Sequence, residues 1–146
     1  MAHMTPELVG KAYEALATGD RDKIRQYWAD DLKWLVPGHN QLSGWKNNLD
    51  EFLAFMKKVG ELSGNSFHMD NICTTTSDEY STDVTRNRGN RANAPDKKLD
   101  IVAVHVLRWR DGKVIEGRGA IQGDGTTQYD QFWSPVTPNL PYSENG

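Results

Sequence analysis

The chain has 146 residues, 37% of them hydrophobic and 25% charged, with a formal net charge of −3 at pH 7. This length suits one domain with a buried core and is too short for two. The acidic balance argues against nucleic acid as a partner, and a single cysteine, Cys73, excludes an internal disulfide and a cysteine-rich zinc site. The sequence has no apolar run of roughly 18 residues, as a membrane span requires, and no apolar signal segment at its start. We therefore expect a cytoplasmic protein without a membrane partner.

The first third of the chain predicts mainly helices. Residues 1–4 are interpreted as a cloning remnant, so His3 is excluded from any chemistry. Thr5-Pro6 is typical of a helix N-terminus, apolar residues follow at helical spacing, and Gly19 ends the helix. A second helix capped by Asp20 is expected to run through Trp28.

A short strand and a third helix are expected next. The strand covers residues 32–36 and ends at Pro37-Gly38, and the residues up to 45 read as a loop. Residues 49–59 predict a helix with a wide apolar face, and residues 60–65 break it.

The remainder of the chain predicts strands. Residues 67–76 and 79–87 are two strands joined by a turn, and residues 88–98 are the longest polar loop. Residues 99–122 are rich in β-branched residues around Asp111-Gly112, which is typical of a hairpin. A short helix over residues 126–133 closes the predicted domain, which spans residues 5–134. Residues 135–146 are proline-rich and predict an extended tail.

This order of elements predicts an α+β fold in which three N-terminal helices lie on one face of a cone-shaped, curved antiparallel sheet. Such a sheet leaves a conical cavity between itself and the helices. Aromatic side chains are numerous enough to line it, namely Trp34, Trp45, Phe52, Phe55, Trp109, Tyr129 and Trp133.

Several short motifs resemble one family. They are Gly19-Asp20, residues 27–31 (YWADD), residues 36–38 (VPG), Gly44, residues 105–116 (HVLRWRDGKVIE) and residues 129–133 (YDQFW). With them the chain resembles the SnoaL-like branch of the nuclear transport factor two-like superfamily, which includes polyketide cyclases, ketosteroid isomerases and limonene epoxide hydrolases. The resemblance implies a cystatin-like α+β barrel with a pocket between helices and sheet, and a homodimer formed through the outer sheet face.

The resemblance also assigns the catalytic positions of the ketosteroid isomerases. Their general base aligns with Val36, just before the proline that ends the first strand. Their tyrosine aligns with about Ala12, one residue before Tyr13, and their second acid aligns with His105.

The resemblance also assigns the catalytic positions of the cyclases and the epoxide hydrolases. The aspartate on the final strand of cyclases and epoxide hydrolases aligns with Gly119, and the epoxide hydrolase arginine and aspartate align near Asp83 and Thr85. No catalytic set of the superfamily is therefore intact, and the fold alone does not fix the reaction.

The hairpin register decides which side chains face the cavity, because side chains alternate along a strand. A two-residue turn would place His105 opposite Arg118. A three-residue loop over residues 110–112 would place it opposite Gly117 and near Gly119. We favour the second register, in which Ile115 and Ile121 face inward and Glu116, Arg118 and Gln122 face outward.

His105 is the principal candidate for chemistry. It lies in mid-strand between two valines, where burial lowers the pKa of an imidazole and leaves a neutral base. Asp83, on the neighbouring strand, is positioned to orient it. We interpret His105 as a catalytic base or acid and Asp83 as its orienting partner. The alternative is a structural histidine bonded to a serine, a threonine or water.

Further residues are expected to contact a ligand. His68 and Asp70 share one strand face, which is either the cavity floor or the dimer face, and His39 lies in the loop at the expected mouth. The histidine spacing matches no metal motif, so neither a metal nor a cofactor is expected. The predicted ligand contacts are Trp34, His39, Trp45, Phe55, His68, Asp70, Thr85, Trp109, Gly119 and Ile121.

These observations favour a homodimeric enzyme that binds a small apolar molecule such as a terpenoid, steroid or polyketide fragment. The expected chemistry is cofactor-independent acid-base catalysis of the isomerase, lyase or cyclase type. The missing family acids at Val36 and Gly119 favour the alternative, a non-catalytic ligand-binding or protein-interaction module of the same fold.

Overall fold

The computed structural model describes residues 4–123 and 125–135, and the predicted tail lies, from residue 136 on, outside the described residues. In chain order the elements are α1 (Pro6–Thr18), α2 (Arg21–Ile24), β1 (Trp28–Val36), β2 (Gly44–Lys46), α3 (Leu49–Ser63), β3 (His68–Thr76), β4 (Tyr80–Arg91), β5 (Ala94–Arg110), β6 (Lys113–Ile121) and α4 (Gly125–Trp133). None of the helices in this described part has both the length and the apolar character that a bilayer crossing requires.

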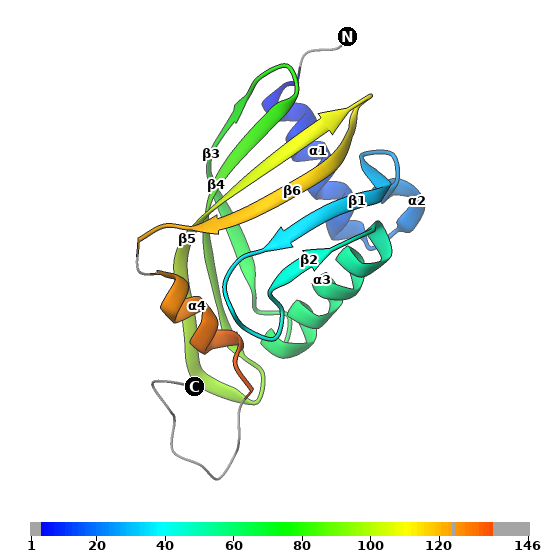
Figure 1. The fold of residues 1–146 in the computed structure, drawn as a ribbon. Helices are drawn as coiled ribbons and strands as arrows, with labels where there is room; N and C mark the ends of the chain where they lie inside the picture. The colour runs from blue at the N-terminus through cyan, green and yellow to red at the C-terminus, as the bar shows by residue number, and fades with distance from the viewer. Residues whose placement is uncertain (1–3, 124, 136–146) are drawn as a thin grey trace.

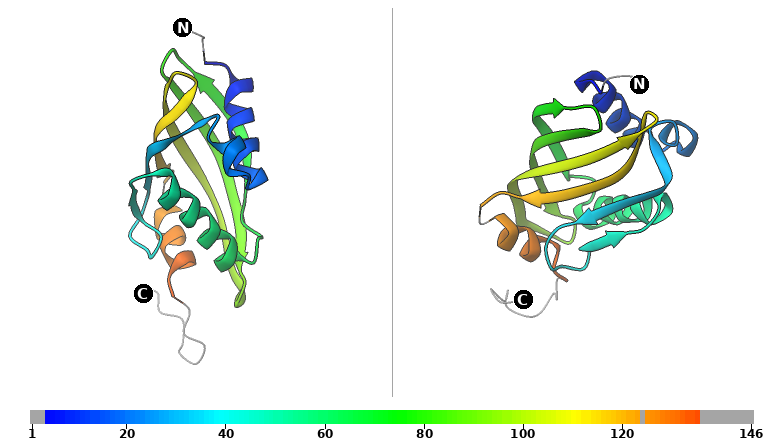
Figure 2. Two further views of the ribbon diagram at one scale, coloured as in Figure 1. Left: turned by 90° about the vertical axis from the view of Figure 1, so that its right-hand side faces the viewer. Right: turned by 45° about the horizontal axis from the view of Figure 1, so that its top comes forward.

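The six strands form one sheet in the order β2-β1-β6-β5-β4-β3. The β1 and β6 strands are parallel, and the other neighbours are antiparallel. The sheet curves around α1 and α3, while α4 covers the end of the sheet away from α1 (Figures 1 and 2). The predicted α+β fold with N-terminal helices is confirmed, with a mixed rather than purely antiparallel sheet.

The caps of α1 form as predicted, whereas the second helix is shorter than expected. The Thr5 hydroxyl accepts a hydrogen bond from the Leu8 backbone N–H at 3.2 Å, and Gly19 ends the helix with a φ of 68°. The α2 helix has only four residues, and Trp28 belongs to β1. The reason is packing, because the fully buried Trp28 indole lies against α1 and donates from Nε1 to the Ala12 carbonyl at 2.9 Å.

Three further boundaries differ from the prediction. The segment expected to be a loop before residue 45 contributes the short edge strand β2, and α3 continues through Gly60 to Ser63. The polar residues 88–98 are not a loop, since they extend β4 and β5 into a long ribbon. One of these polar residues, Arg91, is only 2% exposed and reaches inward, where it donates to the carbonyls of Phe132 at 2.9 Å and Ser134 at 2.7 Å.

The β5–β6 hairpin has a two-residue turn, so the expectation of a three-residue loop is wrong. Asp111 and Gly112 have φ values of 52° and 76°, and Arg110 pairs directly with Lys113. A bulge then leaves Ile115 unpaired between the pairs Trp109–Val114 and Arg108–Glu116.

The bulge restores the side-chain alternation that the three-residue loop would have produced. His105 pairs with Gly119 and not with Gly117, the partner expected for it, but both glycines lie on the same face. Ile121 lines the interior and Arg118 is exposed, as predicted. Ile115 is the exception. The fully buried Val114 takes the inward position expected for it.

Candidate functional site

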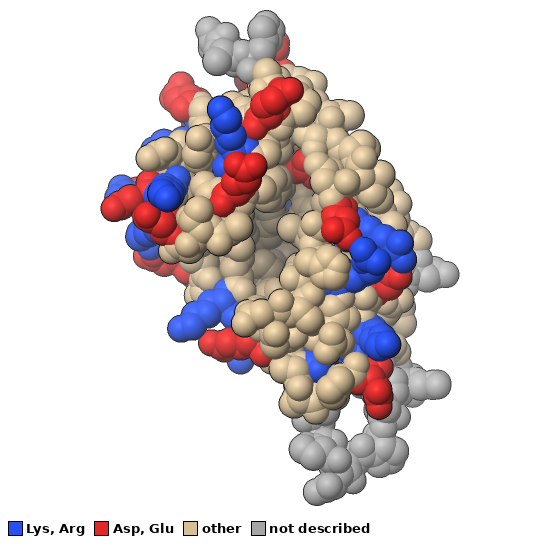
Figure 3. Space-filling view, turned by 180° about the vertical axis from the view of Figure 1, so that it is seen from behind, with Lys and Arg blue, Asp and Glu red and all other residues tan. Residues whose placement is uncertain are grey.

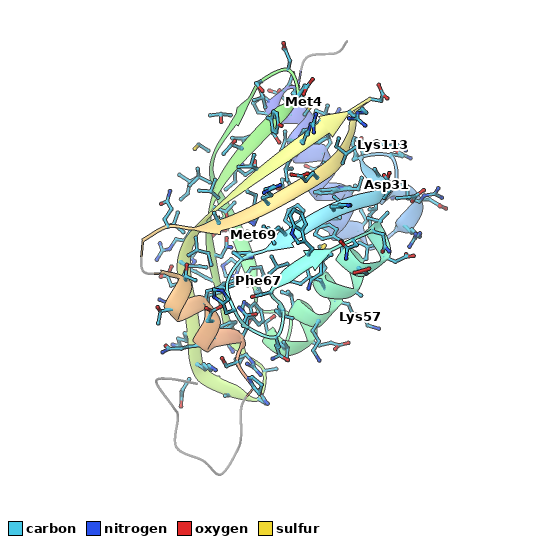
Figure 4. The ribbon with its side chains drawn as sticks, in the orientation of Figure 1. Met4, Asp31, Lys57, Phe67, Met69 and Lys113 are labelled. Carbon is cyan, nitrogen blue, oxygen red and sulfur yellow. The ribbon has the colours of Figure 1, made fainter. Side chains whose placement is uncertain are left out.

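A cavity of about 400 Å³ lies between the sheet and the helices α1, α3 and α4. The space-filling view from behind shows its mouth as a hollow in the surface (Figure 3). Phe67 and Met69, at the start of β3, contribute to its wall (Figure 4). Pockets for small molecules have volumes of roughly 300–1,000 Å³, so the cavity is large enough for such a ligand.

The wall of this cavity is uncharged. Among the described residues, no Asp, Glu, Lys or Arg lines it, and its titratable side chains are two tyrosines and two histidines. Burying an ion without a counter-charge is costly. The cavity therefore suits a neutral, largely apolar ligand.

His105 lies on the inner face of β5, in the middle of the sheet. Its cross-strand partners are Asp83 on β4 and Gly119 on β6. The Trp34 ring stacks on the imidazole with centroids 5.7 Å apart. A Cβ atom at position 119 would lie 3.1 Å from Pro37, the residue that follows β1. Glycine at this position therefore lets the end of β1 approach His105 closely.

The surroundings of His105 favour a neutral imidazole. Burial lowers the pKa of His105 from its ordinary value of 6.5, and the negative charge of Asp83 opposes that shift in part. Within the described part of the chain, Nδ1 is buried without a hydrogen-bond partner, while the residue lines the cavity. Nδ1 is therefore closed to a ligand, which leaves Nε2 as the ring nitrogen for such a contact.

Asp83 lies behind His105 and is 2% exposed. Its Oδ1 accepts a hydrogen bond from the Thr74 hydroxyl at 2.8 Å, and its buried Oδ2 has no hydrogen-bond partner of good geometry among the described residues. Asp83 does not line the cavity, so any effect that it has on a ligand must act through its neighbours.

Tyr13 is a cavity residue that the sequence prediction did not include among its site residues. Burial, followed by the charge and hydrogen-bonding influence of Asp83, raises the pKa of the Tyr13 hydroxyl well above its usual value. The hydroxyl makes no hydrogen bond of good geometry, as is true of Asp83 Oδ2 and His105 Nδ1. Helical spacing could have identified it, because Tyr13, Leu16 and Ala17 form one face of α1 and all line the cavity.

Six of the predicted site residues lie on the cavity wall. His68 is at the rim, with 53% of its side chain exposed and its Nδ1 2.9 Å from the Ser66 carbonyl. The six are Trp34, Phe55, His68, His105, Gly119 and Ile121.

Two predicted ligand contacts from the loop around β2 lie outside the cavity. Trp45 is 40% exposed, and the Arg118 guanidinium lies over its ring at 5.1 Å, on the outer side of the sheet. His39 is exposed, and its backbone N–H is bonded to Asp130 of α4. The prediction fails for both because it treats residues 38–45 as a mouth loop, whereas β2 and α4 fix this segment at the sheet edge.

Three predicted contacts on the long strands are also outside the cavity wall. Asp70 is exposed and paired with Arg88 at 2.6 Å. Thr85 is buried and donates to the Asn87 side chain at 2.6 Å. Trp109 is buried beyond the cavity, where its Nε1 donates to the Ser81 hydroxyl at 2.9 Å. Each of these side chains is occupied by a partner within the protein.

Comparison of the sequence with family models places the chain in a known family. The family model of the SnoaL-like domain matches residues 9–117. The chain belongs to this family. No curated protein sequence matches the SnoaL-like chain, so its relatives are found among solved structures.

Solved structures that resemble this SnoaL-like domain share its fold over nearly their whole length. Bal32a from a soil-derived mobile gene cassette is 23% identical with a TM-score of 0.76, covering 87% of this chain and 94% of that chain. A Xanthomonas campestris protein of unknown function with a cystatin-like fold is 24% identical with a TM-score of 0.75, covering 88% and 97%. TerC, co-crystallized with polyporic acid, is 16% identical with a TM-score of 0.66, covering 80% and 89%. At these identities the likeness establishes the fold.

Proposed function

We propose that this SnoaL-like protein is a cofactor-independent acid-base enzyme acting on a small apolar carbonyl compound, such as a terpenoid, steroid or polyketide fragment. The reaction is of the isomerase, lyase or cyclase type. The observation that carries the proposal is a buried imidazole of lowered pKa on the wall of an uncharged cavity, with a carboxylate behind it. Neutral imidazole is the usual general base near pH 7.

In the proposed reaction, His105 Nε2 removes a proton from the carbon next to the carbonyl. The C–H bond breaks, an N–H bond forms, and the electron pair moves onto the carbonyl oxygen as an enolate. The charge of Asp83 stabilises the imidazolium that results. The Tyr13 hydroxyl, which stays protonated, supplies a donor for the enolate oxygen, and His105 returns the proton at a second position.

A ligand screen followed by proton exchange tests this function. A compound present at 100 times its dissociation constant adds about 2.7 kcal/mol of stability, which a thermal-shift assay detects. Ketones found in this way are then incubated in D₂O, and exchange next to the carbonyl is followed by NMR. Ligands that bind without exchange would support the non-catalytic binding module instead. TerC, a solved structure of the same fold, was co-crystallized with polyporic acid, so that compound is included in the screen.

Replacing Asp83 by asparagine should move the pH profile of the reaction in a defined direction. The charge of Asp83 raises the pKa of His105, so its removal lowers that pKa further. The acidic limb of the exchange rate should therefore shift to lower pH, and the rate on the plateau should fall because the imidazolium loses its counter-charge. An unchanged profile, or a shift to higher pH, would contradict the proposed role. Asp100→Asn is the control, since Asp100 is exposed and paired with Arg86.

The homodimer that the family resemblance implies is part of this proposal. Val102, Val104 and Val106 alternate with the inward residues of β5, and Val106 is 38% exposed. Such a valine row on the outer face of the sheet suits burial against a second copy. Light scattering is expected to give twice the mass of the chain, and Val104→Arg should reduce it to the mass of one chain. A single-chain mass for the parent protein would contradict the dimer.

A further inference from the structure

A second group of polar side chains lies at the α4 end of the cavity. Tyr129 and Trp133, one turn apart on α4, and Asn87 on β4 are all buried and all line the cavity. We call these three residues the α4-end donor set. None of them is used in the reaction proposed for His105.

Trp133 presents a buried hydrogen-bond donor beside the Tyr129 hydroxyl, which it influences only weakly. The residue is 1% exposed, and among the described residues its Nε1 has no hydrogen-bond partner of good geometry. An indole N–H can only donate. A buried donor without a well-aligned partner is unfavourable, so an acceptor supplied by a ligand would satisfy this N–H better than the protein does.

The other two members of the set are also held as donors. Burial, with a further contribution from the charge of Asp130, raises the pKa of the Tyr129 hydroxyl, and the hydrogen-bonding influence of Trp133 offsets this only in part. The Thr85 hydroxyl donates to Asn87 Oδ1 at 2.6 Å and occupies the amide oxygen. The Asn87 side-chain NH₂ group is then the part of that amide which remains to bind a ligand.

The donor set is distant from His105. Asn87 is four residues after Asp83 on the same face of β4, which at about 3.3 Å per residue corresponds to about 13 Å. Asp83 pairs with His105, whereas Asn87 pairs with Ile101. The ribbon shows α1, which carries Tyr13, and α4 at opposite ends of the sheet (Figure 1). Ala103, which lies between Ile101 and His105 on β5, and its cross-strand partner Ile121 line the cavity between them.

We infer that the ligand is an elongated, uncharged molecule with an oxygen acceptor at each end. One oxygen belongs to the carbonyl that reacts at His105, an assignment that rests on the proposed function. The second, a neutral carbonyl or ether oxygen, accepts hydrogen bonds from the α4-end donor set. A carboxylate is disfavoured at that end, because the described wall of the cavity has no cation to pair with it.

Two rigid probes of equal size test this inference by calorimetry. The first is 4,4′-diacetylbiphenyl, and the second is 4-acetyl-4′-isopropylbiphenyl, in which an isopropyl group replaces one acetyl group. The diacetyl compound should bind about tenfold more tightly, the usual effect of one satisfied buried donor. Trp133→Phe, which keeps a ring but removes the N–H, should weaken the diacetyl compound about tenfold and leave the isopropyl compound unchanged.

Tyr129→Phe provides a second, smaller truncation if Trp133→Phe does not fold. The inference is overturned if the parent protein binds both probes equally, if it does not bind the diacetyl compound, or if neither variant changes the preference. Deuterium exchange at the acetyl methyl group separates this result from the proposed function. Exchange that depends on His105 without any probe preference would refute the donor set alone. A preference that depends on Trp133 without exchange would support the donor set and refute the enzymatic proposal.

Discussion

Replacement of His105 by glutamine is expected to reduce carbonyl-adjacent proton exchange by a factor of about 10²–10⁴, the usual contribution of a positioned general base. Glutamine fills a similar volume next to Trp34 and Gly119 but cannot take up a proton near neutral pH. The rate of deuterium incorporation, measured by NMR for parent and variant with the same ketone, checks this expectation.

The control for this variant is His39→Gln, because His39 is exposed and lies outside the cavity wall. It should exchange at the parent rate. A parent-like rate in His105→Gln, with an intact fold, would mean that the base is another group and that His105 is structural.

His105→Gln also has a predicted effect on stability, and this effect depends on pH. Because burial lowers the pKa of His105 in the folded state, the unfolded chain protonates first as the pH falls below about 6.5. The unfolded state then binds more protons, so the parent protein loses free energy of unfolding on acidification. His105→Gln should lack this part of the loss, which urea titrations at pH 7 and pH 5 measure.

Gly117→Ala is expected to lower the free energy of unfolding by about 1–3 kcal/mol, the usual cost of overpacking a dense core. A Cβ atom at this position would overlap the Trp34 ring. That ring cannot move freely, since it contacts Phe52 with centroids 4.6 Å apart and Trp28 at 6.1 Å as well as His105. Urea unfolding measures the loss, and ligand affinity should fall with it because a displaced Trp34 enters the cavity.

Gly10→Ala is the matched control for that substitution. A Cβ atom at Gly10 on α1 meets nothing within 4 Å, so the change should raise the free energy of unfolding by about 0.5–1 kcal/mol through helix propensity. If Gly117→Ala were as stable as the parent, the packing of Trp34 against β6 would not be tight, and the close approach of β1 to β6 would need another cause.

The elements with a strong local signal could be predicted from the sequence. Thr5, Gly19 and the apolar spacing between them mark α1, and the β-branched run before Asp111 marks β5. The end of the β4–β5 ribbon could not be predicted, because Arg91 and its polar neighbours read as a loop until α4 is known to supply carbonyl partners. Trp28 likewise joins β1 only through contacts with α1.

The site could be predicted where strand alternation and a buried position coincide. His105 and Gly119 are such residues, whereas Trp45 and Trp109 show that an aromatic residue in a strand does not reveal whether it faces the cavity, the outer surface or solid core. The α4-end donor set escaped prediction for a different reason. Its members come from β4 and α4, about 40 residues apart in the chain, and only the closed fold brings them to one wall.

The unpaired Ile115 has a genetic consequence. It is the extra residue of β6, so deletion of this one codon would join Val114 to Glu116 and leave the pair His105–Gly119 in place. Deletion of a paired residue acts differently, because losing Gly117 would bring Arg118 opposite Leu107 and turn its side chain to the inner face of the sheet. In a lineage with this hairpin, β6 can therefore shorten by one residue at the bulge with the cavity wall unchanged, whereas the same loss two residues later would direct a guanidinium toward an otherwise uncharged cavity.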